Sequence, residues 1–150
     1  MRVFDTVADY VAEKGKEIGV SEWVQIDQDR VNKFADATGD HQWIHIDPER
    51  TQKELGIGTI AHGYLTLSLL PYLMGKISTV KSATRGINYG SNQVRFTNMV
   101  PVGSRVRCRV KLKDATPKAG GTQITNEVTM EIEGQERPAM VAETLSLIFE

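Results

Sequence analysis

The chain has 150 residues, of which 40% are hydrophobic and 25% are charged, a composition typical of one globular domain over residues 1–150. Its 18 basic and 19 acidic residues give a net charge of -1, so the sequence offers no positive field for binding nucleic acid. It has no apolar run long enough for a membrane span, no signal-peptide core and only 1 cysteine, so we expect a cytoplasmic protein without membrane contacts or an internal disulfide.

The first forty residues predict two helices with a strand between them. Apolar side chains at helical spacing predict a helix over residues 6–17, and residues 20–26 have the composition of a strand. Asp27 is suited to cap the second helix, and Gly39 to end it in a left-handed conformation. The histidine-rich segment that follows therefore begins where a helix stops and the chain turns.

Two further helices are expected before the main strands begin. Pro48 directly after Asp47 is typical of a helix start, and Gly56 of a helix end, so we expect the histidine-rich residues before Asp47 not to be helical. Residues 63–76 are apolar almost all round, which predicts a helix buried on all sides. Pro71 should kink this helix or change its register.

The second half of the chain predicts an antiparallel sheet. The expected strands cover residues 84–96, 105–113 and 124–133, with a last strand through Phe149. The last strand is apolar on both faces over much of its length, which indicates an interior strand. The apolar face of such a sheet needs a cover, and the helix over residues 63–76 is the candidate. A sheet wrapped around a central helix is the hot-dog architecture, an α+β fold.

One expected strand carries five cations on a single face: Arg105, Arg107, Arg109, Lys111 and Lys113. The next strand returns through a turn at Gly120-Gly121 and presents acidic residues at matching positions: Glu127, Glu131 and Glu133. Cross-strand ion pairs therefore explain the pattern, and contact with an anionic ligand is the alternative. Cys108 falls on the apolar face of the basic strand, so we expect a buried, unreactive thiol.

The histidines are the strongest indication of a functional site. All 3 lie close together in sequence, at His41, His45 and His62, beside Asp40. Asp40 and His45 share one turning segment and can hold a water between them. A carboxylate would orient that water, and an imidazole with an ordinary pKa of about 6.5 can accept its proton near neutrality. We therefore predict Asp40 and His45 as an acid–base pair.

Gly63 opens the buried helix and is the second element of this predicted site. Its N–H is one of the unpaired donors at a helix amino end, where the helix dipole favours negative charge. Such a donor suits a thioester carbonyl whose oxygen gains charge in the transition state. For His62, just before it, a structural role at the helix start and a role in lining the site are both open.

A metal site is the alternative use of these residues. His41 and His45 are four positions apart and could, with Asp40 and His62, bind zinc or iron. Residues four positions apart are neighbours on one face only in a helix, and this segment is not expected to be helical. We therefore expect no metal. His41 is then expected to form surface contacts or hydrogen bonds.

The segment from Phe34 to Asp47, FADATGDHQWIHID, resembles the hydratase motif of the MaoC-like dehydratases, the R-specific enoyl-CoA hydratases, and most of all the nodulation protein N-like members. Many of these proteins carry Asn-Pro where this chain has Gln42-Trp43. The spacing from Asp40 to His45 is nevertheless unchanged. The resemblance continues through four further segments and so covers most of the chain: Ala61-His62-Gly63, Asn88-Tyr89-Gly90, Val94-Arg95-Phe96 and Pro101-Val102-Gly103.

This resemblance implies a hot-dog homodimer in which Asp40 and His45 activate water and the Gly63 amide binds the oxyanion. The predicted reaction is reversible syn hydration of a trans-2-enoyl thioester to the (R)-3-hydroxyacyl thioester, with coenzyme A or an acyl carrier as part of the substrate and no other cofactor. We expect substrate at a subunit boundary lined by Asn88, Tyr89 and Gly90, because Asn and Gly weaken a strand unless a ligand or backbone lies close. The alternatives are a hot-dog thioesterase and a non-catalytic acyl-thioester-binding module.

Overall fold

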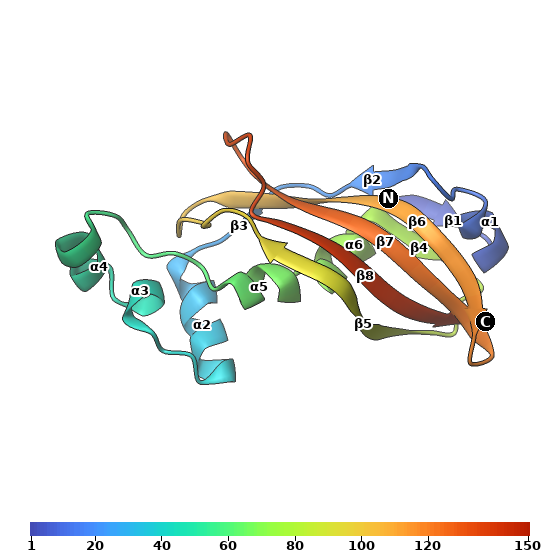
Figure 1. Cartoon of the computed structure of the whole chain (residues 1–150), viewed down its shortest axis with the longest axis horizontal. Coiled ribbons are helices and arrows are strands. Elements are labelled where there is room, and N and C mark those ends of the chain that lie inside the picture. Colours follow the sequence, from blue (N-terminus) through green and yellow to red (C-terminus); the bar gives the residue numbers. More distant parts are fainter.

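The computed structural model describes all residues, 1–150, and its main feature is a curved sheet with a broken helix on its concave face (Figure 1). The sheet has 6 strands in the order β2-β6-β7-β8-β5, with the short β3 also paired to β6. The predicted hot-dog architecture is therefore confirmed. The strands are β2 (Glu17–Val20), β3 (Val24–Gln25), β5 (Arg85–Phe96), β6 (Arg105–Lys118), β7 (Gly121–Ile132) and β8 (Met140–Phe149).

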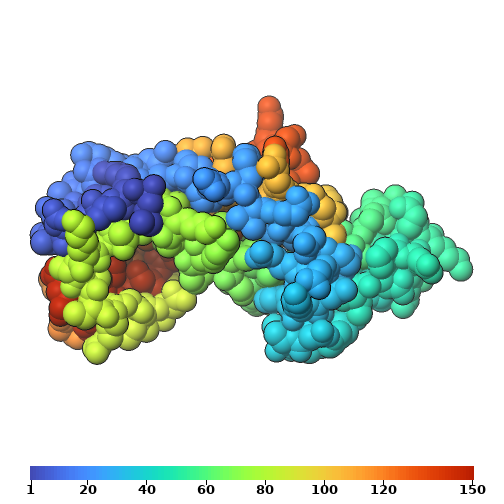
Figure 2. All heavy atoms as spheres, turned by 180° about the vertical axis from the view of Figure 1, so that it is seen from behind, coloured from blue at the N-terminus to red at the C-terminus, as the bar shows by residue number.

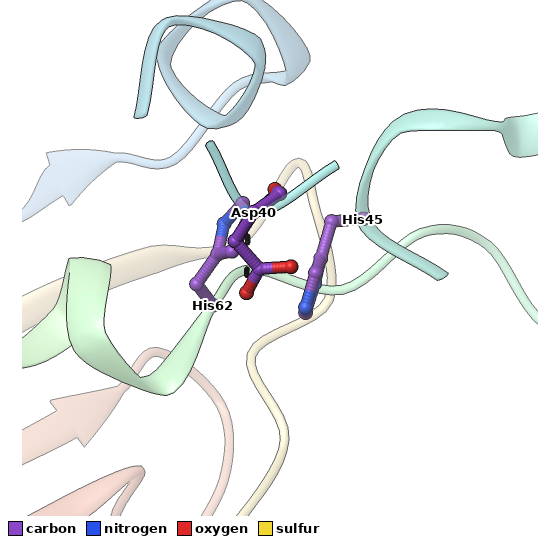
Figure 3. A group of neighbouring side chains, drawn as sticks. All are labelled: Asp40, His45 and His62. Carbon is purple, nitrogen blue, oxygen red and sulfur yellow. Dashed lines mark hydrogen bonds and ion pairs between the residues drawn. The ribbon is translucent and has the colours of Figure 1, made fainter. Parts of the chain in front are cut away.

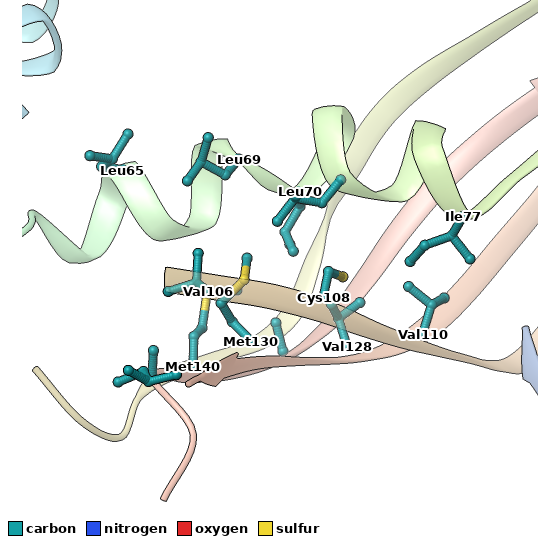
Figure 4. Packing of buried hydrophobic residues seen from close by; sticks show 14 of the residues in the cluster. Leu65, Leu69, Leu70, Ile77, Val106, Cys108, Val110, Val128, Met130 and Met140 are labelled. Carbon is teal, nitrogen blue, oxygen red and sulfur yellow. The ribbon is translucent and has the colours of Figure 1, made fainter. Parts of the chain in front are cut away.

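The central helix is divided into α5 (Gly63–Ser68) and α6 (Leu70–Ile77). The break lies at Leu69, and Pro71 occupies the first turn of α6, where its missing N–H is not needed. The predicted change in the helix near this proline is thus confirmed. Both segments direct apolar side chains onto the sheet, and Figure 4 shows this contact for Leu65, Leu69, Leu70 and Ile77 above Val106, Cys108, Val110, Val128, Met130 and Met140.

The prediction that this helix is buried on all sides is wrong for the single chain. Tyr64 and Tyr72 are 68% and 47% exposed, and Ser68 and Pro71 lie exposed on the same side of the helix. The sheet curves around only one side of the helix, so the other side keeps its apolar and aromatic side chains in solvent. Leu73 lies on the covered side and is fully buried.

The hairpin of β6 and β7 pairs the basic strand face with carboxylates, as predicted. Arg107 lies opposite Glu131, and Lys111 lies opposite Glu127. All five cations of the face form ion pairs, which explains them without an anionic ligand: Arg105–Glu133, Arg107–Glu131, Arg109–Glu131, Lys111–Glu127 and Lys113–Glu143. On the opposite face Cys108 is fully buried, and burial raises the pKa of its thiol to about 12, so it is not a nucleophile.

Strand β8 is interior, as predicted, because it pairs with β7 on one side and β5 on the other. Strand β5 pairs only with β8, so its second edge has no partner in this chain. Its register shifts between Asn88 and Gly90 and again between Ser91 and Gln93. These bulges lie in the segment that was expected to line a subunit boundary.

The first twenty-six residues differ from the prediction. The expected helix over residues 6–17 is only α1 (Val7–Val11), because Gly15 turns the chain at φ 85° and its N–H reaches β6. The expected strand over residues 20–26 is divided into β2 and β3. A separate two-stranded parallel sheet, β1 (Arg2–Phe4) with β4 (Ser78–Val80), was not predicted.

The helices α2 (Gln28–Thr38) and α4 (Pro48–Leu55) lie beyond one end of the sheet (Figure 1). Their caps are those predicted: Asp27 and Asp47 at the starts, and left-handed Gly39 and Gly56 at the ends. The segment between them was expected not to be helical, which is wrong for α3 (Trp43–Ile46). This single turn forms because Asp47 N–H bonds back to the Trp43 carbonyl at 3.0 Å. None of the helices combines the length and apolar character needed to cross a bilayer.

Candidate active site

Asp40 lies in the turn between α2 and α3. Gly39 ends α2 at φ 81°, and this left-handed residue directs the chain away from the helix axis. The Asp40 carboxylate accepts a hydrogen bond from the N–H of Gln42 at 3.3 Å, which continues the turn. The Asp40 side chain remains 53% exposed, so its carboxylate is available to water or a ligand.

His45 lies on α3 and is only 7% exposed. Its Nδ1 is 2.7 Å from the carbonyl oxygen of Ile60. Because a carbonyl oxygen can only accept, Nδ1 carries the hydrogen and Nε2 keeps its lone pair. Burial lowers the pKa of His45 below its ordinary value, although the bond to Ile60 acts in the opposite direction. His45 is therefore a neutral imidazole with a free basic nitrogen near physiological pH.

His62, at the start of α5, completes a cluster with Asp40 and His45. One carboxylate oxygen and one ring nitrogen of each histidine lie within 4.8 Å of one another. Figure 3 shows the Asp40 carboxylate directed toward the His45 ring, with His62 beside it. A single water with hydrogen bonds of about 2.8 Å can bridge groups roughly 4.5 Å apart, so this spacing suits the predicted bound water.

A cavity of about 380 Å³ opens beside His45 and Gly63. The N–H of Gly63 has no acceptor within the protein, so it is free to bind a ligand oxygen. A Cβ at this position would meet the Phe96 ring at 3.0 Å, which explains why glycine fits here. Other residues of the cavity wall were not predicted, because nothing in their spacing along the sequence links them to His45. They include Thr66, Phe96, Thr97, Asn98, Met99 and Arg137.

Three predicted site residues lie elsewhere in this chain. Asn88, Tyr89 and Gly90 line a second cavity, of about 580 Å³, between α6, β5 and β8. Asn88 also lines a neighbouring cavity, and Figure 2 shows a hollow there, with the C-terminal strand at its floor. The His45 cavity and the second cavity share no lining residue. A site that uses both sets within one chain is therefore not formed here.

His41 does not join the cluster. Its Nε2 is 2.9 Å from a carboxylate oxygen of Asp36, and this contact raises the pKa of the imidazole. This agrees with the predicted hydrogen-bonding role and removes one of the four ligands considered for a metal.

The geometry of the remaining three groups also fits a metal ion poorly. The His45 and His62 rings are stacked, with centroids 3.8 Å apart and planes at 25°. Ring nitrogens bind metals along lone pairs in the ring plane, and two nearly parallel planes do not direct their lone pairs to one point. Extended treatment with a strong chelator should therefore leave activity unchanged, as measured by assay and elemental analysis. Stoichiometric zinc or iron whose removal abolishes activity would contradict this prediction.

Comparisons with known proteins agree with this architecture. The sequence matches the family described as MaoC like domain over residues 9–135. It is 52% identical to 3-hydroxyacyl-thioester dehydratase Z of Mycobacterium tuberculosis over 146 residues, 97% of each chain. It is 44% identical to Nodulation protein N of Rhizobium leguminosarum bv. viciae, over 95% of this chain and 91% of that protein. The fold is similar to that of unliganded R-hydratase PhaJ1 from Pseudomonas aeruginosa, with a TM-score of 0.73, 20% identity and coverage of 92% and 83%. The chain therefore belongs to the family of MaoC-like domain proteins.

Proposed function

We propose that this protein is an (R)-specific hydratase and 3-hydroxyacyl-thioester dehydratase. It interconverts a trans-2-enoyl thioester plus water with the (R)-3-hydroxyacyl thioester. The observation that carries the proposal is the free Nε2 of His45, held beside the Asp40 carboxylate at a cavity that also contains the unpaired Gly63 N–H. The name of the relative that is 52% identical supports the same reaction.

Each of these groups has a defined role in the hydration direction. A water lies between Asp40 and His45, and Nε2 of His45 takes its proton while the oxygen bonds to C3 of the enoyl thioester. The C2–C3 double bond becomes an enolate, whose oxygen accepts a hydrogen bond from the Gly63 N–H. His45 then returns the proton to C2 on the face that received the hydroxyl. Dehydration is the reverse. Because both directions use only the groups named above, we propose that neither a redox cofactor nor a metal takes part.

Asp40 serves this cycle through its negative charge. When His45 holds the transferred proton it is an imidazolium in a largely buried position, which is unfavourable without a counter-charge. A carboxylate within 4.8 Å stabilises that cation and also accepts a hydrogen bond from the water. The water is then oriented with its other hydrogen toward His45.

The direct test is purified protein with crotonyl-CoA, followed by loss of the conjugated enoyl absorbance. Chiral analysis of the product should give (R)-3-hydroxybutyryl-CoA, and the Asp40→Asn variant, prepared in the same way, controls for contaminating hydratase. A second assay uses butyryl-CoA, a saturated thioester, with a reagent that detects free thiol. Release of free thiol without hydration would support a thioesterase instead, and ligand binding with no turnover would support an acyl-thioester-binding module.

The acid limb of the pH profile should report His45. Hydration requires the neutral imidazole, so kcat/KM falls as the pH drops through the pKa of His45. Because burial lowers this pKa, the midpoint should lie below the ordinary value of 6.5. Rates measured from about pH 4.5 to about pH 8 cover this range. A midpoint above 6.5 would contradict the assignment of His45 as the base.

We include in the proposal a homodimeric, cytoplasmic enzyme that acts on coenzyme A or acyl-carrier thioesters. Pairing of two subunits would cover the free edge of β5. It would also cover the exposed side of the central helix that carries Tyr64 and Tyr72. Asn88, Tyr89 and Gly90 of one subunit would then lie at the boundary and contact substrate there.

Light scattering at micromolar concentration should therefore report about twice the chain mass of 16.7 kDa. The expected reason is burial of the β5 edge together with the tyrosine-bearing side of the central helix. A stable monomer that hydrates crotonyl-CoA at the full rate would contradict the shared site.

A further inference from the structure

His62 contacts both members of the Asp40–His45 pair but does not line the cavity beside them. It is 2% exposed, its Nε2 lies 3.0 Å from the Asp40 backbone carbonyl oxygen, and its ring stacks on His45 (Figure 3). We propose that His62 is a positioning residue for this pair, which rests on the proposed dehydratase function. It holds the Asp40 main chain and the His45 ring in place and does not itself contact the substrate.

The contact with Asp40 connects the catalytic turn to the central helix. Because the carbonyl oxygen only accepts, Nε2 of His62 carries the hydrogen. The other hydrogen bonds of Asp40 are longer and local, at 3.3 Å to Gln42 and 3.4 Å to Thr38. Only the His62 bond comes from a distant, buried residue, at the start of α5. Without it, the exposed turn is held only by its own neighbours in sequence.

The stacking contact limits the orientation of the His45 ring. One edge of that ring is fixed by the bond from Nδ1 to the Ile60 carbonyl, and one face by His62 at 3.8 Å between centroids. Phe34 packs against His62 with centroids 4.9 Å apart, so His62 is itself held by a helix on the other side of the turn. These contacts together fix the direction of the basic Nε2 of His45.

Packing alone does not explain a histidine at this position. Nδ1 of His62 is buried and has no hydrogen-bond partner, an arrangement that destabilises a fold. An aromatic hydrocarbon of similar shape would keep the contacts with Phe34 and His45 without that unpaired atom. What it would lose is the bond from Nε2 to Asp40. The histidine is therefore explained by this bond.

Two variants separate the contacts. His62→Phe keeps a ring for stacking and removes the bond to Asp40. His62→Gln removes the ring and keeps the donor, because the glutamine Nε2 is as many bonds from the backbone as the histidine Nε2. We expect His62→Phe to lower kcat by roughly 10- to 100-fold with KM within about twofold, since misplacing a catalytic group has effects of this size. His62→Gln should stay within about tenfold of wild type.

Stability should change in the opposite direction from activity. His62→Phe removes a buried unpaired polar atom, and the Asp40 carbonyl that loses its donor lies on an exposed turn where water can replace it, so the thermal midpoint should equal or exceed that of wild type. A packing role predicts the reverse order of activity, with His62→Phe close to wild type and His62→Gln impaired. Equal kcat for wild type and His62→Phe, or His62→Phe more active than His62→Gln, would overturn the proposal.

A readout that is independent of turnover separates this inference from the proposed function. In nuclear magnetic resonance spectra of the ring nitrogens, wild-type His62 should carry its hydrogen on Nε2. In carbon spectra, the chemical shift of the Asp40 carbonyl carbon should differ between wild type and His62→Phe. An unchanged Asp40 signal, or His62 with hydrogen only on Nδ1, would overturn the positioning role. Wild-type protein that gives these signals but does not hydrate crotonyl-CoA would overturn the proposed reaction and leave the positioning contact supported.

Discussion

Asp40→Asn and His45→Gln are each expected to lower kcat by roughly 10²–10⁴-fold, the usual contribution of a positioned acid–base group. Asp40→Asn removes the charge that stabilises protonated His45, and His45→Gln removes the nitrogen that takes the proton. Both positions keep a side chain of similar size, so the fold should be unchanged. Steady-state rates with crotonyl-CoA and far-UV circular dichroism measure the two effects separately.

The double variant should be little slower than the slower single variant, because groups that act as a unit do not contribute additively. His41→Gln is the matched control: this histidine is a neighbour in sequence but contacts Asp36 instead of the pair. It should keep kcat near the wild-type value. Near-normal hydration by Asp40→Asn or by His45→Gln would refute the assignment of the pair.

Leu73→Ala is expected to lower the free energy of unfolding by about 2–5 kcal/mol, a large part of the roughly 5–15 kcal/mol typical of a domain. Leu73 is fully buried on the side of α6 that faces the sheet. Its truncation leaves a cavity between the central helix and the strands that cover it. Urea unfolding followed by circular dichroism should show a lower midpoint with an unchanged slope.

The control for this variant is Lys53→Ala, an exposed position on the helix α4, away from the sheet. It should change the free energy of unfolding by about 0.5 kcal/mol or less, as surface substitutions usually do. If Leu73→Ala were as stable as Lys53→Ala, the central helix would not be packed on the sheet as described.

The features that the sequence predicted correctly depend on neighbours along the chain. The caps at Asp27 and Gly39 follow from side-chain and backbone preferences that act within one turn of helix. Strand alternation likewise placed Cys108 inside and Arg107 outside, and the hairpin turn set the pairing of Arg107 with Glu131. The hydratase motif singled out Asp40 and His45 because its residues follow one another in sequence, and the structure places one polar atom of each side chain within 4.8 Å of the other.

What only the tertiary structure decided depends on contacts between distant segments. The helix expected over residues 6–17 is short because Gly15 bonds to β6, almost a hundred residues away. The tautomer of His45 follows from the Ile60 carbonyl, and the place of His62 against Asp40 follows from where α5 meets the α2–α3 turn. Phe96 became part of the site wall because β5 ends beside Gly63. A sequence pattern reports local conformational preference and the side that is buried, whereas hydrogen-bond partners across the fold are set only when the sheet closes around its helix.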